Sequence, residues 1–335
     1  MSDSDRPSRR RFLISSAGAF SGAISGAIAL PVASQAFAAS EIKMKTYTYK
    51  TVGELKVQAD VYRPDDRQVR DIVVWIHGGA LINGSRQGVS GRVRKWALGA
   101  GHALVSIDYR LSPETQLPGV VSDLEDAFKW IRAEGPKLFN GNADKIAVAG
   151  GSAGGYLTLT SGFRVKPRPT ALLSLWGYGD LVGEWYSKPS PHPRHHRKKL
   201  TKEEAFAQVS GKPISMAKQR TGDGGAFYQY CRQQGIWPTA VSGWDPLKQP
   251  EKFFPYMAVK HVTKEYPPTA LVHGSDDTDV PFEQSEMMAE QFRQHGVSHE
   301  FIAVPKAEHG LAGGDAKLID EAYAKAFKFM DEKMA

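Results

Sequence analysis

Five short apolar runs constrain the fold of this chain more than any other feature of its sequence. Each run is continuously apolar, which is typical of strands buried on both faces of a sheet. Segments with apolar residues at helical spacing lie between them, and this alternation predicts a mostly parallel α/β sheet covered by helices on both faces. The predicted strands are residues 71–76, 103–107, 146–149, 171–175 and 269–272, and the predicted helices are residues 92–98, 120–132, 153–161, 282–294 and 315–330.

Two segments depart from this alternation. Residues 41–50 and 54–63 alternate polar with apolar or aromatic side chains around Gly53, which predicts an antiparallel hairpin at one edge of the sheet. Residues 177–265 carry many proline, glycine and aromatic residues and no clean period. We interpret them as a cap or insertion over the active-site end of the sheet.

The first part of the chain has the features of an export signal. Residues 8–13 read Ser-Arg-Arg-Arg-Phe-Leu, and a run of small and apolar residues over 14–32 and an Ala-x-Ala pattern at 36–38 follow them. This order predicts a twin-arginine signal peptide over residues 1–38 and a periplasmic or secreted domain over residues 39–335. The alternative is a transmembrane anchor, since the run is long enough to cross a bilayer. Its Gly, Ser and Ala content favours the signal peptide, so no integral membrane span is expected after processing.

Composition narrows the chemistry. Cys231 is the single cysteine, so neither an intramolecular disulfide nor a Cys-based zinc site can form. The net charge of +7 is partly local, because residues 191–199 hold three histidines and four Lys or Arg. We interpret this segment as a solvated basic loop, free to touch an anionic polysaccharide or a membrane surface, rather than as a metal site. No metal, organic cofactor or nucleic-acid partner is expected, and the sequence does not indicate the oligomeric state.

A candidate nucleophile follows the third predicted strand. Residues 150–154 read Gly-Gly-Ser-Ala-Gly, and a GxSxG string between a strand and a helix is the pattern of a nucleophile elbow, which exposes a serine hydroxyl at the edge of a sheet. The alternative is a glycine-rich loop without a chemical role, in a chain that has 33 glycines. The strand and helix on either side favour the elbow and make Ser152 the candidate nucleophile.

Both partners that a serine nucleophile needs lie downstream. A hydroxyl requires a base within hydrogen-bond reach, itself oriented by a third group. We assign His309, after the strand-like residues 300–304, as the general base and Asp277 as the acid, because the chain order in doubly wound hydrolases is Ser, acid, His. Asp276 and Asp279 lie beside Asp277 and are interpreted instead as residues that could cap the helix starting near residue 282.

Backbone amides complete the predicted site. Acyl transfer places negative charge on the carbonyl oxygen, and preorganised amides stabilise it. Residues 76–80, Ile-His-Gly-Gly-Ala, follow the first predicted buried strand, where such a loop belongs. The amides of Gly79, Ala80 and Ala153 are therefore predicted to form an oxyanion hole, whereas an ordinary glycine turn is the alternative.

These motifs resemble the α/β-hydrolase superfamily, and more narrowly the carboxylesterases related to hormone-sensitive lipase and to bacterial acetyl and feruloyl esterases. Residues 106–114, Ser-Ile-Asp-Tyr-Arg-Leu-Ser-Pro-Glu, are similar to the DYRLAPE segment of that group, and we interpret Asp-Tyr-Arg as structural support beneath the site. The similarity covers residues 71–175 and 269–309 and departs at Ala80, where lipase-like members carry a third glycine, and at Gly151. It implies the α/β-hydrolase fold and ester hydrolysis without metal or cofactor.

The predicted function is that of a serine esterase. Its expected substrates are acetyl or short-chain acyl esters of small molecules, including carbohydrate and aryl esters. Amide hydrolysis on the same triad and a non-catalytic binding protein of the same fold are the alternatives. Nine aromatic residues are predicted to line an apolar or sugar-stacking cleft, or else to form the insertion's own core: Trp176, Tyr178, Trp185, Tyr186, Phe227, Tyr228, Tyr230, Trp237 and Trp244.

Overall fold

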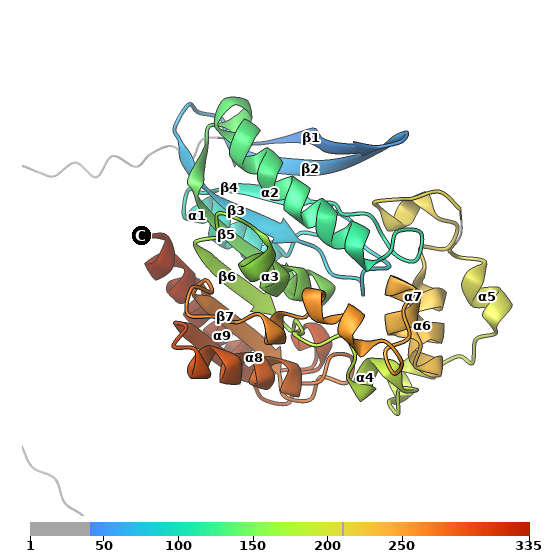
Figure 1. Cartoon of the computed structure of the whole chain (residues 1–335). Coiled ribbons are helices and arrows are strands. Elements are labelled where there is room, and N and C mark those ends of the chain that lie inside the picture. Colours follow the sequence, from blue (N-terminus) through green and yellow to red (C-terminus); the bar gives the residue numbers. More distant parts are fainter. Residues whose placement is uncertain (1–40, 210) are drawn as a thin grey trace, which may run out of the picture. The chain divides into compact units, whose positions relative to one another are not determined.

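In the described part of the chain, eight strands form one sheet in the order β1-β2-β4-β3-β5-β6-β7-β8 (Figure 1). The computed structural model describes residues 41–209 and 211–335, so the predicted signal peptide over residues 1–38 lies outside the described residues. The strands are β1 (Ile42–Val52), β2 (Leu55–Pro64), β3 (Arg70–Ile76), β4 (Ala103–Ile107), β5 (Gly141–Gly151), β6 (Ala171–Leu175), β7 (Thr269–Gly274) and β8 (His299–Val304).

The predicted fold class is confirmed. β1 and β2 form an antiparallel hairpin and β2 pairs antiparallel with β4, while every pairing from β4 through β8 is parallel. β5 lies between β3 and β6, and the carboxyl ends of parallel strands meet at the same edge of a sheet. The loops that follow β3, β5 and β7 therefore lie at that one edge.

Helices cover both faces of the sheet. The buried side chains of α2, α3 and α8 share one core with Ile72, Val74 and Ile76, whereas those of α1 and α9 share a second core with Val73 and Trp75. Alternate residues of β3 thus enter opposite cores, which explains why its sequence is apolar without a break. These helices are α1 (Gly91–Gly99), α2 (Leu117–Phe139), α3 (Ala153–Arg164), α8 (Glu283–Gln294) and α9 (Ala316–Met334).

The largest difference from the predicted helices is in α2, which is longer than residues 120–132 at both ends. Pro118 lies in its first turn, where a missing amide hydrogen is tolerated. At the other end the helix continues through Pro136 and stops at Asn140, which has a left-handed conformation. β5 also begins five residues before the predicted strand, at Gly141.

The segment between β6 and β7 holds short helices, and its described residues contain no strand. It comprises α4 (Glu184–Ser187), α5 (Lys202–Phe206), α6 (Gly225–Gln234), α7 (Trp237–Ser242) and the 3-10 turns η1 (Pro193–His195), η2 (Ala217–Gln219), η3 (Pro250–Lys252), η4 (Phe254–Tyr256) and η5 (Ala258–Lys260). A sixth 3-10 turn, η6 (His309–Leu311), follows β8. Over the part of the chain that the structure describes, no helix has the length and apolar character needed to cross a membrane.

Candidate active site

Ser152 lies at the sharp turn between β5 and α3. Its backbone has φ 57° and ψ −122°, a conformation that costs a non-glycine residue free energy and persists only where the surroundings hold it. The amide of Ser152 donates to the carbonyl of Leu175 in β6 at 2.9 Å. A Cβ on Gly154 would collide with the carbonyl oxygen of Ile76 in β3. The small residues of the segment 150–154 therefore let α3 begin directly against the neighbouring strand β3.

The structure brings Ser152, His309 and Asp277 together. His309 Nε2 lies 3.0 Å from Ser152 Oγ, and His309 Nδ1 lies 2.8 Å from Asp277 Oδ2. When Nδ1 carries the ring proton and donates it to the carboxylate, Nε2 is left as an acceptor for the serine hydroxyl. The three residues come from the loops after β5, β7 and β8, so their contact is a product of the parallel sheet.

Asp277 is held as a buried anion. Its Oδ1 accepts hydrogen bonds from the amides of Asp279 and Val280, both at 2.9 Å. Burial by itself would raise the pKa of Asp277, but hydrogen bonding to His273 and His309 outweighs burial and lowers the pKa to about 2. The carboxylate therefore stays ionised at neutral pH and fixes the orientation of the His309 ring.

The predicted oxyanion loop lies against the nucleophile. A Cβ on Gly78 would approach the Ser152 Cβ to 3.2 Å and the Gly151 carbonyl oxygen to 2.7 Å, so only glycine fits there. Within the described residues, the amides of Gly79, Ala80 and Ala153 donate to no other protein group. Free amides beside the nucleophile are what stabilisation of a carbonyl oxyanion requires.

Side chains from elsewhere in the chain hold this loop in place. Trp237 of α7 donates its indole N–H to the Ala80 carbonyl at 3.0 Å. The Tyr109 hydroxyl donates to the His77 carbonyl at 3.0 Å, and the two rings stack with centroids 4.3 Å apart. Burial lowers the pKa of His77 to about 4, so this histidine is neutral and serves packing. Tyr109 thus has the supporting role that the sequence indicated, whereas the role of Trp237 was not predicted.

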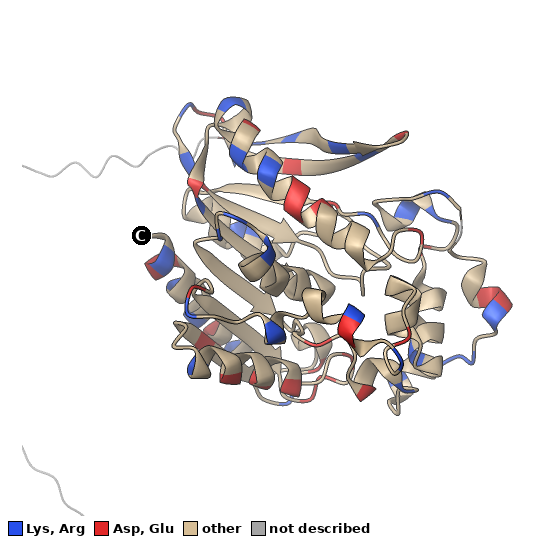
Figure 2. Ribbon diagram, in the orientation of Figure 1, with Lys and Arg blue, Asp and Glu red and all other residues tan. Residues whose placement is uncertain are grey.

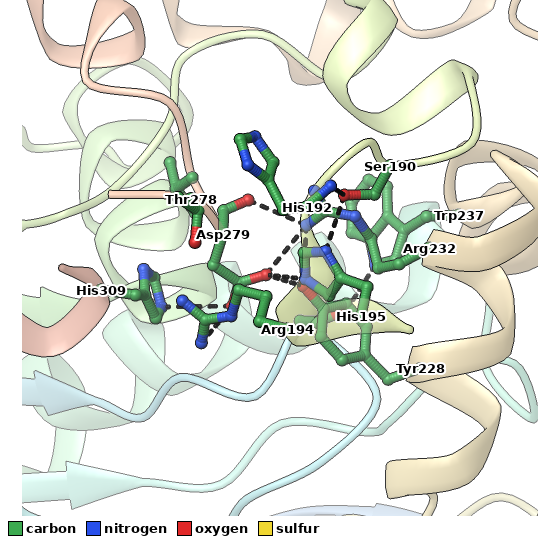
Figure 3. A network of polar contacts seen from close by, with 12 residues as sticks. Ser190, His192, Arg194, His195, Tyr228, Arg232, Trp237, Thr278, Asp279 and His309 are labelled. Atoms are coloured by element: carbon green, nitrogen blue, oxygen red, sulfur yellow. Dashed lines mark hydrogen bonds and ion pairs between the residues drawn. The ribbon is translucent and has the colours of Figure 1, made fainter. Parts of the chain in front are cut away.

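Asp279 has a different role from the one predicted. Neither Asp276 nor Asp279 caps α8, whose first residue follows Phe282 without a side-chain cap. Instead, Asp279 Oδ1 lies 2.8 Å from His195 Nε2 and accepts from the Tyr228 hydroxyl at 2.6 Å and from Arg232 at 2.9 Å. The other carboxylate oxygen, Oδ2, lies 3.7 Å from His309 Nε2. Figure 3 shows Asp279 between His195 and His309.

The segment 191–199 is only partly the solvated loop that was predicted. His195 is 1% exposed, and its Nδ1 lies 2.7 Å from the Ser190 hydroxyl. Arg194 pairs with Glu308 at 2.5 Å and lies 3.7 Å from Asp279 Oδ2. The interpretation is therefore wrong for Arg194 and His195, whose side chains lie against the Asp279 carboxylate, while residues 196–199 are exposed. Nothing in the sequence around Pro193 predicted that the next two side chains would be directed into the protein.

A cavity of about 590 Å³ adjoins His309, and none of the nine aromatic residues lines it. Tyr178, Tyr186, Phe227 and Trp237 are at most 1% exposed, and the rings of Tyr186 and Trp237 stack 3.9 Å apart. These four side chains belong to the core that covers one face of the sheet, so the prediction that they line an aromatic cleft is wrong for this cavity. Trp176 is the exception near the site, with its ring edge-on to His309 at 6.4 Å.

The donor set offers no metal centre in the part of the chain that is described. No group of three His, Cys, Asp or Glu side chains there is arranged to hold a metal ion. The carboxylates and imidazoles nearest Ser152 are instead bonded to one another or to arginine.

Comparisons with known proteins identify the fold family. A family profile described as alpha/beta hydrolase fold matches residues 73–313. The chain is 28% identical over 313 residues to non-reducing polyketide synthase adrD of Penicillium rubens, covering 79% of this chain and 12% of the synthase. It is 26% identical over 255 residues to esterase LipC of Mycobacterium tuberculosis, covering 75% of this chain and 56% of LipC. The chain therefore spans a small part of the synthase and about half of LipC.

A solved structure has a similar fold. The acetyl ester-xyloside bifunctional hydrolase of Caldicellulosiruptor lactoaceticus superimposes with a TM-score of 0.63 at 20% identity, over 86% of this chain and 96% of that chain. At this identity the likeness concerns the arrangement of strands and helices.

Proposed function

This chain belongs to the alpha/beta hydrolase fold family, and we propose that it is a serine esterase that hydrolyses carboxylic esters through an acyl-enzyme. The observation that carries the proposal is a chain of hydrogen bonds through His309. Its Nδ1 lies 2.8 Å from Asp277 Oδ2, and its Nε2 lies 3.0 Å from Ser152 Oγ. A nucleophile, a base within reach of it and a group that orients the base are the parts that nucleophilic acyl transfer needs.

The first half of the proposed reaction transfers the acyl group to Ser152. Its Oγ bonds to the ester carbonyl carbon while His309 Nε2 takes the hydroxyl proton, and the carbonyl π electrons move onto oxygen. The amides of Gly79, Ala80 and Ala153 stabilise that oxyanion. His309 then gives its Nε2 proton to the departing alcohol oxygen as the carbon–oxygen bond breaks.

The second half releases the acid. Water replaces the alcohol beside His309, loses a proton to Nε2 and attacks the acyl carbon. Collapse of this second oxyanion breaks the bond to Ser152, whose Oγ recovers the proton from His309. Asp277 stabilises the imidazolium in both halves without itself taking a proton.

Replacement of the nucleophile tests this proposal. Ser152→Ala removes the attacking oxygen and is expected to lower turnover of p-nitrophenyl acetate by at least about 10⁴-fold, while circular dichroism and melting temperature stay at wild-type values. Ser298→Ala, at an exposed serine before β8, is the matched control and is expected to keep full activity. Wild-type turnover in Ser152→Ala would refute the mechanism.

Two further assays separate the esterase from the alternatives. A fluorophosphonate probe is expected to label the wild type and Ser298→Ala but not Ser152→Ala, whereas a non-catalytic binding protein would take no label. Parallel assays of an ester and its matched amide are expected to give turnover of the ester. Faster cleavage of the amide would reassign the enzyme to amide hydrolysis.

We also propose that residues 1–38 direct export of the folded protein, on the strength of the twin-arginine string at residues 8–13. Arg9→Lys combined with Arg10→Lys is expected to retain the precursor in the cytoplasm of a bacterial host, as followed by cell fractionation and immunoblotting. Export of this variant at the wild-type level would contradict a twin-arginine signal.

A further inference from the structure

The cavity beside His309 has a wall of unusual charge. It encloses about 590 Å³, and its lining includes Arg194, Arg197, Lys198, Gln229, Glu308 and His309, together with a few aliphatic side chains. Three of these side chains are cationic and one is a carboxylate. Figure 2 shows Lys and Arg on the segment that leads into α5, which supplies this wall.

The single carboxylate on the wall is already satisfied. Glu308 pairs with Arg194 at 2.5 Å, accepts from the His309 amide at 2.7 Å and from the Thr278 hydroxyl, and so has little capacity left for another cation. Arg194 also lies 3.7 Å from Asp279 Oδ2. In Figure 3 its guanidinium lies beside Asp279, on the side of the network that faces His309.

The two remaining cations are available to a ligand. Arg197 forms no ion pair with any described residue of the chain. Lys198 pairs with Glu204 at 2.8 Å, but the two side chains are 70% and 43% exposed, and exposed pairs of this kind contribute little. The wall therefore keeps a positive excess within the cavity that opens onto His309.

The chemistry of ester cleavage indicates which part of a substrate enters this cavity. His309 Nε2 must protonate the departing alcohol oxygen, so the alcohol portion lies on the His309 side of the ester. Gly79 and Ala80, which face the carbonyl oxygen in the proposed reaction, are not part of the wall. The cavity is therefore placed to receive the alcohol portion rather than the acyl group.

We infer that this cavity is a subsite for a carboxylate on the alcohol portion of the ester, which makes O-acylated hydroxy acids the substrate class. The inference rests on the proposed ester hydrolysis and deepens it. The planar fork of a guanidinium matches a carboxylate, and the ammonium of Lys198 adds a second positive charge. A neutral alcohol portion would leave Arg197 without an ion-pair partner and Lys198 with only its exposed pair to Glu204.

Matched substrates test the subsite. For 5-acetoxypentanoate and its neutral analogue 5-acetoxypentanamide, we expect kcat/KM for acetate release to favour the carboxylate by about tenfold at low ionic strength, with the preference shrinking as salt is added. In a second pair the charge lies on the acyl side: monomethyl adipate and the methyl ester of adipamic acid. No such preference is expected there. A preference confined to the acyl-side pair would overturn the assignment to the alcohol portion.

Variants of the wall give the second test. Arg197→Gln combined with Lys198→Gln is expected to remove most of the roughly tenfold preference between the first two substrates. Lys199→Gln is the matched control, because Lys199 is an exposed cation next to the wall that does not line the cavity, and it is expected to keep the preference. Equal use of both substrates by the wild type would overturn the subsite and leave ester hydrolysis standing.

Binding without turnover separates the two proposals. In titration calorimetry, Ser152→Ala is expected to bind 5-acetoxypentanoate about tenfold more tightly than the amide, and the double wall variant on this background is expected to bind both alike. If the wild type cleaves no ester, the proposed function fails and the calorimetry still decides the subsite. Equal affinity for acid and amide would overturn it.

Discussion

His309 lies between two carboxylates that belong to the same loop but bond to different parts of the chain. Asp277 accepts from Nδ1 at 2.8 Å, and Asp279 Oδ2 lies 3.7 Å from Nε2. Burial opposes the charged ring, but the hydrogen bond to Asp277 and the charges of Asp279 and Asp277 outweigh burial and the nearby Arg194, so the pKa of His309 is raised. The charge of Glu308, the residue before His309, is compensated by its ion pair with Arg194.

The pH dependence of turnover follows from this arrangement. His309 must be neutral to accept the serine proton, so a raised pKa moves the acid limb of kcat/KM to higher pH. Asp279→Asn removes a negative charge near Nε2 and is expected to shift the limb to lower pH by about one unit. Arg194→Gln removes a positive charge and is expected to shift it to higher pH. The measurement is the pH profile of kcat/KM on a neutral ester.

A control and a contrary result define this test. His295→Gln changes an exposed histidine at the C-terminal end of α8 and is expected to leave the profile unchanged. If Asp279→Asn and Arg194→Gln both lower the rate equally at every pH, the two charges act only on structure. Because Arg194 is part-exposed, its variant keeps the test available if the buried Asp279 variant fails to fold.

The lone thiol gives a prediction of a different kind. Burial raises the pKa of Cys231 to about 12, so the reactive thiolate is scarce in the folded protein. Iodoacetamide at pH 8 is expected to leave native protein unmodified and to alkylate Cys231 in urea, as read by mass spectrometry. Rapid alkylation of the native protein would show that α6 opens readily.

Sequence reasoning reached the residues with a motif and missed those without one. Ser152, Asp277 and His309 follow strands at positions that chain order singles out, and the structure brings them together. Asp279 and His195 are bonded at 2.8 Å but stand in separate loops. No periodicity or motif links two such loops, so their contact had to be seen in three dimensions.

At the scale of elements, α7 supports the oxyanion loop through one hydrogen bond. Trp237 is completely buried and donates to the Ala80 carbonyl at 3.0 Å. The same residue stacks on Tyr186 of α4. The loop after β3 is therefore held partly by the insertion and not by the sheet alone.

Removal of this hydrogen bond is expected to weaken catalysis more than binding. Trp237→Phe keeps an aromatic ring in the core but leaves the Ala80 carbonyl without its donor, and kcat is expected to fall about three- to tenfold with little change in KM. Trp244→Phe, at a part-buried tryptophan of the same insertion, is the control and is expected to keep kcat. A change in KM alone would contradict a role in positioning the amides.

The buried strands were predictable because their sequences are continuously apolar, and the long helices because their apolar residues recur at helical spacing. The predicted strands 71–76 and 103–107 match β3 and β4 within one residue. Residues 177–265 were the least predictable part, because their short helices pack aromatic side chains against one another without a repeating pattern. The family resemblance drawn from the motifs is confirmed by the match over residues 73–313.

At the scale of the whole described molecule, a buried ion pair between Arg220 and Glu114 joins the insertion to the segment after β4. The side chains of Arg220 and Glu114 are 3% and 2% exposed. Arg220 also donates to the Ser112 carbonyl at 2.6 Å and to the Ile82 carbonyl. One guanidinium thus connects three stretches of chain near the oxyanion loop.

Loss of one partner of this pair is expected to destabilise the whole fold. Glu114→Gln leaves the buried Arg220 charge uncompensated and should lower the free energy of unfolding by about 3 kcal/mol, measured by urea denaturation. Glu114→Leu combined with Arg220→Met removes both charges and is expected to cost less than the single change. Glu204→Gln, at an exposed pair, is expected to change stability by less than about 0.5 kcal/mol.

The hydrogen bonds of Asp279 have a consequence for how related proteins evolve and how they can be recombined by engineering. Its carboxylate takes its donors from His195, Tyr228 and Arg232, all within the insertion, while its backbone belongs to the loop of Asp277. A chimera that received residues 177–265 from a relative would leave the buried Asp279 carboxylate without these donors, 3.7 Å from Nε2 of the reacting histidine. Lineages that remodel this cap are therefore expected to exchange the aspartate in the same step, so the two regions should be grafted as one unit.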